Sequence, residues 1–360
     1  MLVTPLPMSA QTAFAQVLEA ALATEHLRNV ASLPGTFTSK RVKGHKYWYY
    51  QFSEPSGARR QLFVGPDNAA VQALIAKSEQ PADRNLPALT RAALALGCAE
   101  ILPRHFKVIR RLSEYGFFRA GGILIGTHAF VAYGNMLGVQ WSGSDASRTL
   151  DIDFAHAGKN ISLALAADFQ VQTHEAIESL EMGFLPIVGM AGKTGGAYLI
   201  PNEKEFRLDF LTTVGRNGET PYEHADLHLT LQPLKFMEYS LENVQQTALL
   251  SGTGSVMVNI PHPARYALHK LIVAGEREGM FAMKSGKDLM QAGLLLDVLR
   301  EIKPWEVEEA WADLLGRGPG WQSRALRGLA MLEKRFPEAA FGKWLQSPGG
   351  GQYMPSPRLP

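Results

Sequence analysis

The segment FFRAGGILIGTHAFVAYGNMLGVQWSGSDASRTLDIDF, residues 117–154, decides the fold class of this protein. Near its end, Asp151 and Asp153 alternate with apolar positions such as Ile152 and Phe154. Because strand side chains alternate between faces, both carboxylates project from one face of a predicted strand. Two neighbouring negative charges are costly unless a cation neutralises them, and Mg²⁺ or Mn²⁺ prefers carboxylate oxygens. The pattern predicts a metal site; the alternative is an exposed strand face with two solvated aspartates.

Two further features favour the metal site. Gly121 and Gly122 stand between a predicted strand at 117–120 and a predicted helix at 123–137. At such a junction, glycines let a phosphate approach backbone N–H groups and a helix N-terminus. Asp209, within FRLDFL, is a third isolated acid in an apolar strand pattern. We therefore expect three aspartates to converge beside a phosphate-binding turn.

These motifs resemble the nucleotidyltransferase superfamily, whose pattern is a Gly-Gly or Gly-Ser turn, a D-x-D strand and a third strand carboxylate. The run GG…RTLDIDF is closer still to AbiE-type toxins and related bacterial proteins, in which an Arg and a Ser or Thr precede the aspartates. Arg148 and Thr149 occupy those positions here. The resemblance also maps a triphosphate-contacting lysine onto Lys270, in PHPARYALHKLIV, and a Lys-Asp pair onto Lys287 and Asp288.

The resemblance covers about residues 100 to 300 and implies a fold, a reaction and a cofactor. It implies an α/β (α+β) nucleotidyltransferase fold with a mixed sheet, and transfer of a nucleotide from a nucleoside triphosphate with release of pyrophosphate. Asp151, Asp153 and Asp209 would be the catalytic metal ligands for Mg²⁺ or Mn²⁺, and Asp209 could instead accept the proton of the nucleophile. One departure is that the interval from Gly122 to Asp151, which contains WSGSDAS, is longer than is usual in the family.

The chain divides into four regions by pattern. Residues 1–87 predict a helix followed by a small antiparallel sheet, and residues 88–216 mix helix and strand periods as the catalytic domain. Residues 217–345 begin with strands and become mostly helical, and the Pro/Gly-rich residues 346–360 are expected to be a disordered tail.

Composition excludes several classes of protein. Cys98 is the only cysteine, which rules out an internal disulfide framework and a multi-cysteine zinc site. The N-terminus lacks the pattern of an export signal, and no apolar run is long enough to span a bilayer. We expect a cytoplasmic protein without a membrane partner.

The predicted N-terminal sheet is basic and aromatic. The basic residues Lys40, Arg41, Lys43, Arg59 and Arg60 accompany the run YWYYQF at 47–52. Basic side chains with aromatics suit phosphate contact and base stacking, so we expect nucleic-acid binding here. The pattern loosely resembles the arm-binding modules of phage-type integrases. The alternative is a sheet packed on its helix with basic edges that oppose aggregation.

The leading hypothesis is thus an enzyme that transfers a nucleotide from a nucleoside triphosphate such as ATP, and the resemblance to AbiE-type toxins implies RNA or tRNA as the acceptor. By resemblance to AbiE-type toxins, an antitoxin protein would be its partner. One alternative is the same chemistry on a protein or small molecule. The other is a non-catalytic nucleic-acid-binding protein on the same fold.

Overall fold

A computed structural model of the chain describes residues 3–27, 35–53, 59–79, 85–141, 144–157, 171–188, 194–214, 218–277 and 282–346. Nearly all of the tail predicted at 346–360 lies outside these residues. Among the described residues, none of the helices is both long enough and apolar enough to cross a membrane.

A mixed sheet of seven strands forms the centre of the described chain. Its strands are β5 (Gly122–Leu124), β7 (Ile152–His156), β8 (Leu185–Val188), β9 (Thr194–Ile200), β10 (Glu203–Thr213), β11 (Tyr222–His224) and β12 (Leu229–Leu234). The main order is β11-β12-β10-β7-β5, and β8 and β9 join through β10. β7 and β10 run parallel, whereas β5 is antiparallel to β7. The predicted mixed sheet is confirmed.

One face of this sheet is the main core. Phe154 of β7 and Phe210 of β10 are fully buried and stacked, with ring centroids 5.1 Å apart. The helices of this layer are α4 (Pro103–Glu114), α5 (Gly126–Leu137) and α7 (Thr173–Glu178). α4 reaches β10 through His105, which stacks on Phe206 at 5.1 Å. Because side chains alternate, the aspartates of β7 and β10 lie on the opposite face.

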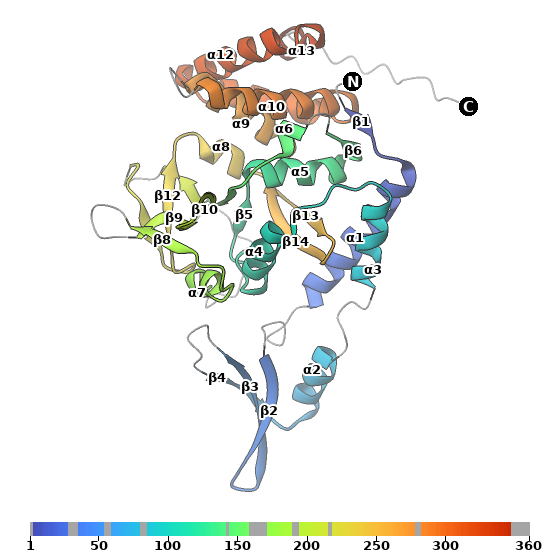
Figure 1. The fold of residues 1–360 in the computed structure, drawn as a ribbon, viewed down its shortest axis with the longest axis vertical. Helices are drawn as coiled ribbons and strands as arrows, with labels where there is room; N and C mark the ends of the chain where they lie inside the picture. Colours follow the sequence, from blue (N-terminus) through green and yellow to red (C-terminus); the bar gives the residue numbers. More distant parts are fainter. Residues whose placement is uncertain are drawn as a thin grey trace.

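The C-terminal helices form a separate layer, at the top of Figure 1. They are α9 (Pro263–Glu276), α10 (Ala282–Ile302), α11 (Pro304–Gly316), α12 (Pro319–Arg335), η4 (Pro337–Ala339) and α13 (Phe341–Gln346). Short elements join this layer to the sheet: α6 (Ser144–Ser147) and α8 (Met237–Leu241), with β1 (Thr4–Pro5) pairing β6 (Val139–Gln140). α9 and α10 pack on each other, and Tyr266 of α9 and Lys287 of α10 reach the backbone carbonyls of Gly126 and Arg148.

A second core lies beside the sheet. The hairpin β13 (Val244–Ser251) and β14 (Gly254–Pro261) packs against α1 (Met8–Leu27) and α3 (Leu86–Ala95). Phe14 and Val17 of α1 are buried there with Leu250. The helix α1, predicted within the 1–87 region, therefore packs on the body of the protein instead of on the N-terminal sheet.

The N-terminal sheet is present as predicted. It consists of β2 (Gly35–Val42), β3 (His45–Ser53) and β4 (Arg59–Pro66), all antiparallel, with α2 (Ala69–Glu79) beside them. Figure 1 shows this unit at the opposite end of the molecule from the C-terminal helices.

The strand predicted at 117–120 and the helix predicted from Ile123 are wrong in their boundaries. Residues 117–121 form turns, β5 occupies Gly122–Leu124, and the helix begins only at Gly126. The apolar run of Ile123, Leu124 and Ile125 favours a central strand, and it pairs with β7. This shift moves the strand-to-helix junction by four residues.

Candidate active site

The three predicted aspartates converge. Asp209 lies directly across from Asp153 in the parallel register of β10 and β7. One carboxylate oxygen from each of Asp151, Asp153 and Asp209 lies within 4.8 Å of the others. Asp209 is buried, whereas Asp151 and Asp153 are half-buried at the edge of the site.

Two neighbouring side chains orient these carboxylates. Arg207 precedes Asp209 by two residues on the same strand face and donates from Nε to Oδ2 at 2.8 Å and from Nη2 to Oδ1 at 2.6 Å. The Thr149 hydroxyl donates to Oδ1 of Asp151. Arg207 was not among the predicted site residues, although its i, i+2 spacing from Asp209 in a strand was the available signal.

The electrostatics of the triad fit a cation. Burial, followed by the charges of Asp151 and Asp209, raises the pKa of Asp153 to about 7, although the charges of Lys270 and Arg207 oppose the shift. Excess negative charge in a half-buried cluster is what a divalent ion with oxygen ligands would neutralise. The residues present therefore fit the Mg²⁺ or Mn²⁺ that the sequence predicts.

Gly126 places a helix N-terminus against this cluster. Its φ is +62°, and a Cβ added to it would overlap Oδ2 of Asp153. The N-cap residue Ile125 makes no side-chain capping hydrogen bond, so the first-turn N–H groups of α5 have no side-chain cap. Uncapped N–H groups at the positive end of a helix dipole are suited to phosphate oxygens. The turn Gly126-Thr127 is the phosphate-binding candidate at this site.

Gly121 and Gly122 do not lie at the strand-to-helix junction where the sequence pattern placed them. Gly122 pairs with His156, at the far end of β7 from Asp153. A Cβ on Gly122 would overlap the ring of Phe117, and the Gly122 carbonyl accepts a hydrogen bond from Nδ2 of Asn259 at 2.9 Å. Both glycines serve close packing. The sequence signal for the observed junction was Gly126-Thr127 directly after the apolar run 123–125.

The helices α9 and α10 bring cations to the site. Nζ of Lys270 donates to Oδ1 of Asp288 at 2.6 Å, and Arg277 bonds the other oxygen. Burial alone would raise the pKa of Asp288, but the Lys270 and Arg277 charges outweigh it and hold that pKa below its ordinary value. Asp288 thus holds Lys270 in place within the electrostatic reach of Asp153.

The two residues of the predicted pair Lys287 and Asp288 contact different partners. Nζ of Lys287 donates to the carbonyl oxygen of Arg148 at 2.6 Å, on the segment that leads into Asp151. Burial lowers the pKa of Lys287, and the charge of Asp151 opposes that shift. Lys287 therefore belongs to the site, while the side chain of Arg148 is exposed beside it.

Tyr266 of α9 supports the turn from behind. Its buried hydroxyl donates to the carbonyl oxygen of Gly126, 2.9 Å away, and lies 2.9 Å from Oε1 of Gln291 on α10. Nε2 of Gln291 donates to the carbonyl of Ala146 at 2.7 Å. This network links both C-terminal helices to the phosphate-binding candidate, and nothing in the sequence pattern pointed to it.

A cleft of about 810 Å³ opens beside the triad, lined by residues that include Thr127, Arg148 and Thr149. In its wall, Nδ1 of His105 lies 2.9 Å from Nε2 of His128. Burial, followed by the charge of His105, lowers the pKa of His128 to about 3, so His128 is neutral at physiological pH. The cleft adjoins both the phosphate-binding candidate and the residue that positions Asp151.

The predicted nucleic-acid residues lie elsewhere, on the N-terminal sheet. Lys40 and Arg41 are on β2, Lys43 is at the β2–β3 turn and Arg59 begins β4. Arg60 is also on β4, but its side chain lies outside the described part of the structure.

Strand carboxylates, an uncapped helix N-terminus and nearby lysines form a candidate site that would suit a nucleoside triphosphate. A family model described as nucleotidyltransferase matches residues 104–316, more than half of the chain. The chain belongs to this nucleotidyltransferase family, which confirms the superfamily predicted from the sequence.

One solved structure is loosely similar: an antigenic nucleotidyltransferase-like protein from Paracoccidioides brasiliensis. It is 17% identical, with 64% of this chain and 95% of that chain covered, at a TM-score of 0.29. No curated protein matches the chain. The closer likeness to AbiE-type toxins stays a prediction.

Proposed function

We propose that this protein transfers a nucleotidyl group from a nucleoside triphosphate to RNA, with tRNA as the first acceptor to test, in a reaction that depends on Mg²⁺ or Mn²⁺. The observation that carries the proposal is the convergence of Asp151, Asp153 and Asp209 within 4.8 Å beside the Gly126 turn. The excess negative charge at Asp153 supports the metal dependence.

The three aspartates would hold the ion. When bound, it would neutralise phosphate oxygens and make the acceptor hydroxyl easier to deprotonate. Both oxygens of Asp209 already accept hydrogen bonds from Arg207. That arrangement favours Asp209 as a ligand over the alternative that it accepts the proton of the nucleophile.

The remaining residues would position the triphosphate. N–H groups at Gly126 and Thr127 would bind its phosphate oxygens. The acceptor hydroxyl loses its proton to solvent water, its oxygen forms a bond to the α-phosphorus as the bond to the bridging oxygen breaks, and pyrophosphate leaves. Lys270 and Lys287 would stabilise the negative charge that develops on this leaving group.

The test is incubation with each α-labelled nucleoside triphosphate, Mg²⁺ and either purified tRNA, total RNA or lysate protein. We expect label on RNA, with loss of at least about 1,000-fold in rate for Asp151→Asn and Asp153→Asn. Label on protein or on a small molecule would overturn the RNA acceptor. Absence of label from every fraction with all four nucleotides would overturn the enzymatic proposal.

The resemblance to AbiE-type toxins supports a second part of the proposal, a toxin restrained by an antitoxin protein. Induction of the wild-type chain alone should then arrest growth, and the Asp151→Asn variant expressed to the same level should not. Equal growth of both strains, with wild-type protein active in vitro, would overturn the toxin role and leave the enzymatic proposal intact.

A further inference from the structure

The two faces of the N-terminal sheet differ in how far their aromatic rings are buried. Tyr50 is 1% exposed and packs edge-on against Phe37, with ring centroids 5.0 Å apart. Val71 and Ile75 of α2 are buried as well. α2 packs against β4, where Val71 lies beside Gly65, and these buried side chains mark the small core of this unit.

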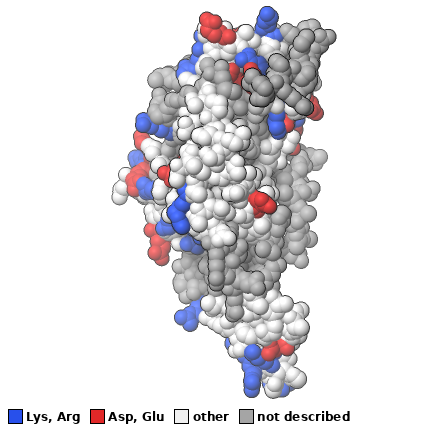
Figure 2. Space-filling model, turned by 90° about the vertical axis from the view of Figure 1, so that its right-hand side faces the viewer, with Lys and Arg blue, Asp and Glu red and all other residues white. Residues whose placement is uncertain are grey.

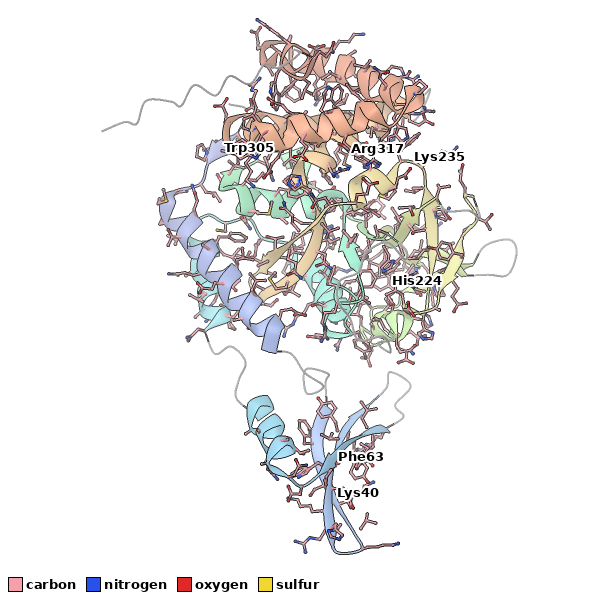
Figure 3. The ribbon with its side chains drawn as sticks, turned by 180° about the vertical axis from the view of Figure 1, so that it is seen from behind. Lys40, Phe63, His224, Lys235, Trp305 and Arg317 are labelled. Carbon is pink, nitrogen blue, oxygen red and sulfur yellow. The ribbon has the colours of Figure 1, made fainter. Side chains whose placement is uncertain are left out.

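The opposite face carries three aromatic rings together. Phe63 of β4 lies 5.6 Å from Tyr49 and 6.0 Å from Tyr47, measured between ring centroids. Phe63 is 61% exposed, although burying such a ring would stabilise the fold. We refer to Tyr47, Tyr49 and Phe63 as the aromatic face. Figure 3 shows Phe63 on the side of the sheet away from α2, with Lys40 nearby.

Polar and charged groups border these rings. Nζ of Lys40 lies 5.1 Å from the centroid of Tyr49 and donates to Oε1 of Gln61 at 2.5 Å. Nε2 of Gln61 donates in turn to Oε1 of Gln51 at 3.1 Å. The aromatic face therefore presents π-surfaces, amides and a cation side by side, instead of one continuous apolar patch.

The surrounding charge is strongly positive. The described strand residues 35–53 and 59–66 carry six lysines and arginines and no acidic residue. The nearby Asp67 accepts from Nε1 of Trp48 at 2.8 Å and pairs with Lys46 at 3.4 Å. Figure 2 shows blue side chains and a red one among white atoms at the lower end of the molecule, where this sheet lies. Such a surface is complementary to a polyanion.

We propose that the aromatic face binds single-stranded nucleic acid, with bases stacked on Tyr47, Tyr49 and Phe63 and phosphates held by Lys40 and its basic neighbours. Stacking needs unpaired bases, so single strands fit this face better than duplexes. A membrane-binding surface would instead present a contiguous apolar patch without the Gln51–Gln61 amides. The inference rests on the proposed function in that it assigns this face to the RNA acceptor.

The experiment uses the full-length protein with point variants. Deleting residues 1–87 would also remove α1, whose Phe14 and Val17 are buried in the second core. Binding of a labelled oligouridine of about 12 nucleotides, a length that small sheet modules bind, is measured by fluorescence anisotropy. A duplex RNA of equal length and vesicles containing anionic lipid are tested in parallel.

Phe63→Ala and Tyr49→Ala should each weaken oligouridine binding by roughly 5- to 150-fold. Leu62→Ala is the matched control. Leu62 directly precedes Phe63 and is 44% exposed, but it pairs with Tyr50 and so lies on the face opposite the aromatic face. The control substitution should change the affinity less than about twofold. Lys40→Gln should reduce the slope of log affinity against log salt by about 0.7.

Three results would overturn the inference: equal affinity of wild type and both ring variants, stronger binding of the duplex than of the single strand, or binding of vesicles alone. Thermal melting of each variant checks that its fold is intact. Nucleoside triphosphate binding should be unchanged in Phe63→Ala, so loss of RNA binding is distinguishable from failure of the active site. If wild type binds oligouridine but labels no acceptor, the proposed reaction fails while the inference stands.

Discussion

Replacing Asp153 with asparagine should stabilise the metal-free protein at neutral and alkaline pH. Burial and the charges of Asp151 and Asp209 raise the pKa of Asp153 from 3.8 to about 7 in the folded state. Below about pH 4 the carboxyl is protonated in both states and adds no penalty. Between about pH 4 and pH 7 only the unfolded chain ionises, so the folded state loses stability as pH rises.

The size of the effect follows from the shift in pKa. A difference of about 3 pH units corresponds to about 4 kcal/mol at about 1.4 kcal/mol per unit. Asp153 keeps some solvent contact, so we expect about 2 kcal/mol of the penalty to be realised. Asp153→Asn removes the ionisation and should recover that amount at about pH 8 and almost nothing at about pH 4.

Urea denaturation in EDTA at the two pH values measures this difference. The exposed Asp226→Asn serves as control and should change the free energy of unfolding by less than about 0.5 kcal/mol at both. Mg²⁺ added at the higher pH should stabilise the wild type and leave Asp153→Asn nearly unchanged. If Asp153→Asn unfolds more easily than wild type at about pH 8 without metal, Asp153 is structural and the charge argument is refuted.

Three other perturbations test the rest of the site. Gly126→Ala should weaken triphosphate binding at least tenfold by calorimetry, because its methyl group would overlap the Asp153 carboxylate. The control is Gly183→Ala, which is also at positive φ but has open surroundings. It should lower the free energy of unfolding by about 1 kcal/mol and leave the triphosphate affinity unchanged. Arg207→Gln should lower the free energy of unfolding, measured by urea denaturation, by about 1–2 kcal/mol, because the buried Asp209 carboxylate loses its cationic partner. A variant as stable as the wild type would contradict this. EDTA should weaken triphosphate affinity in the wild type, and an unchanged dissociation constant would exclude a metal-assisted site.

The sequence could predict features that depend on local periodicity. Alternation within a strand is fixed by backbone geometry, so Asp151 and Asp153 had to share a face wherever that strand lay. The helices α9 to α12 were likewise predictable from apolar spacing, to within a few residues at most ends. The basic character of the N-terminal sheet also needed no tertiary information.

The roles of the glycines could not be predicted from the sequence in the same way. A glycine that accommodates a phosphate and a glycine that accommodates a phenyl ring carry the same letter, and only the neighbours distinguish them. Gly122 faces Phe117, whereas Gly126 faces Asp153. Counting from Gly126 also shortens the interval to Asp151 by four residues, which reduces the departure from the family pattern noted in the sequence.

By itself, the sequence determined that two carboxylates lie on one strand face, that a third occupies another strand, and that basic and aromatic residues share a small sheet. Only the tertiary structure decided that β10 pairs with β7, so that Asp209 meets Asp153, and that Phe63 is exposed while Tyr50 is buried. The reason is physical: side-chain direction follows from bonds between adjacent residues, whereas strand neighbours and covered faces depend on contacts between residues far apart in the chain.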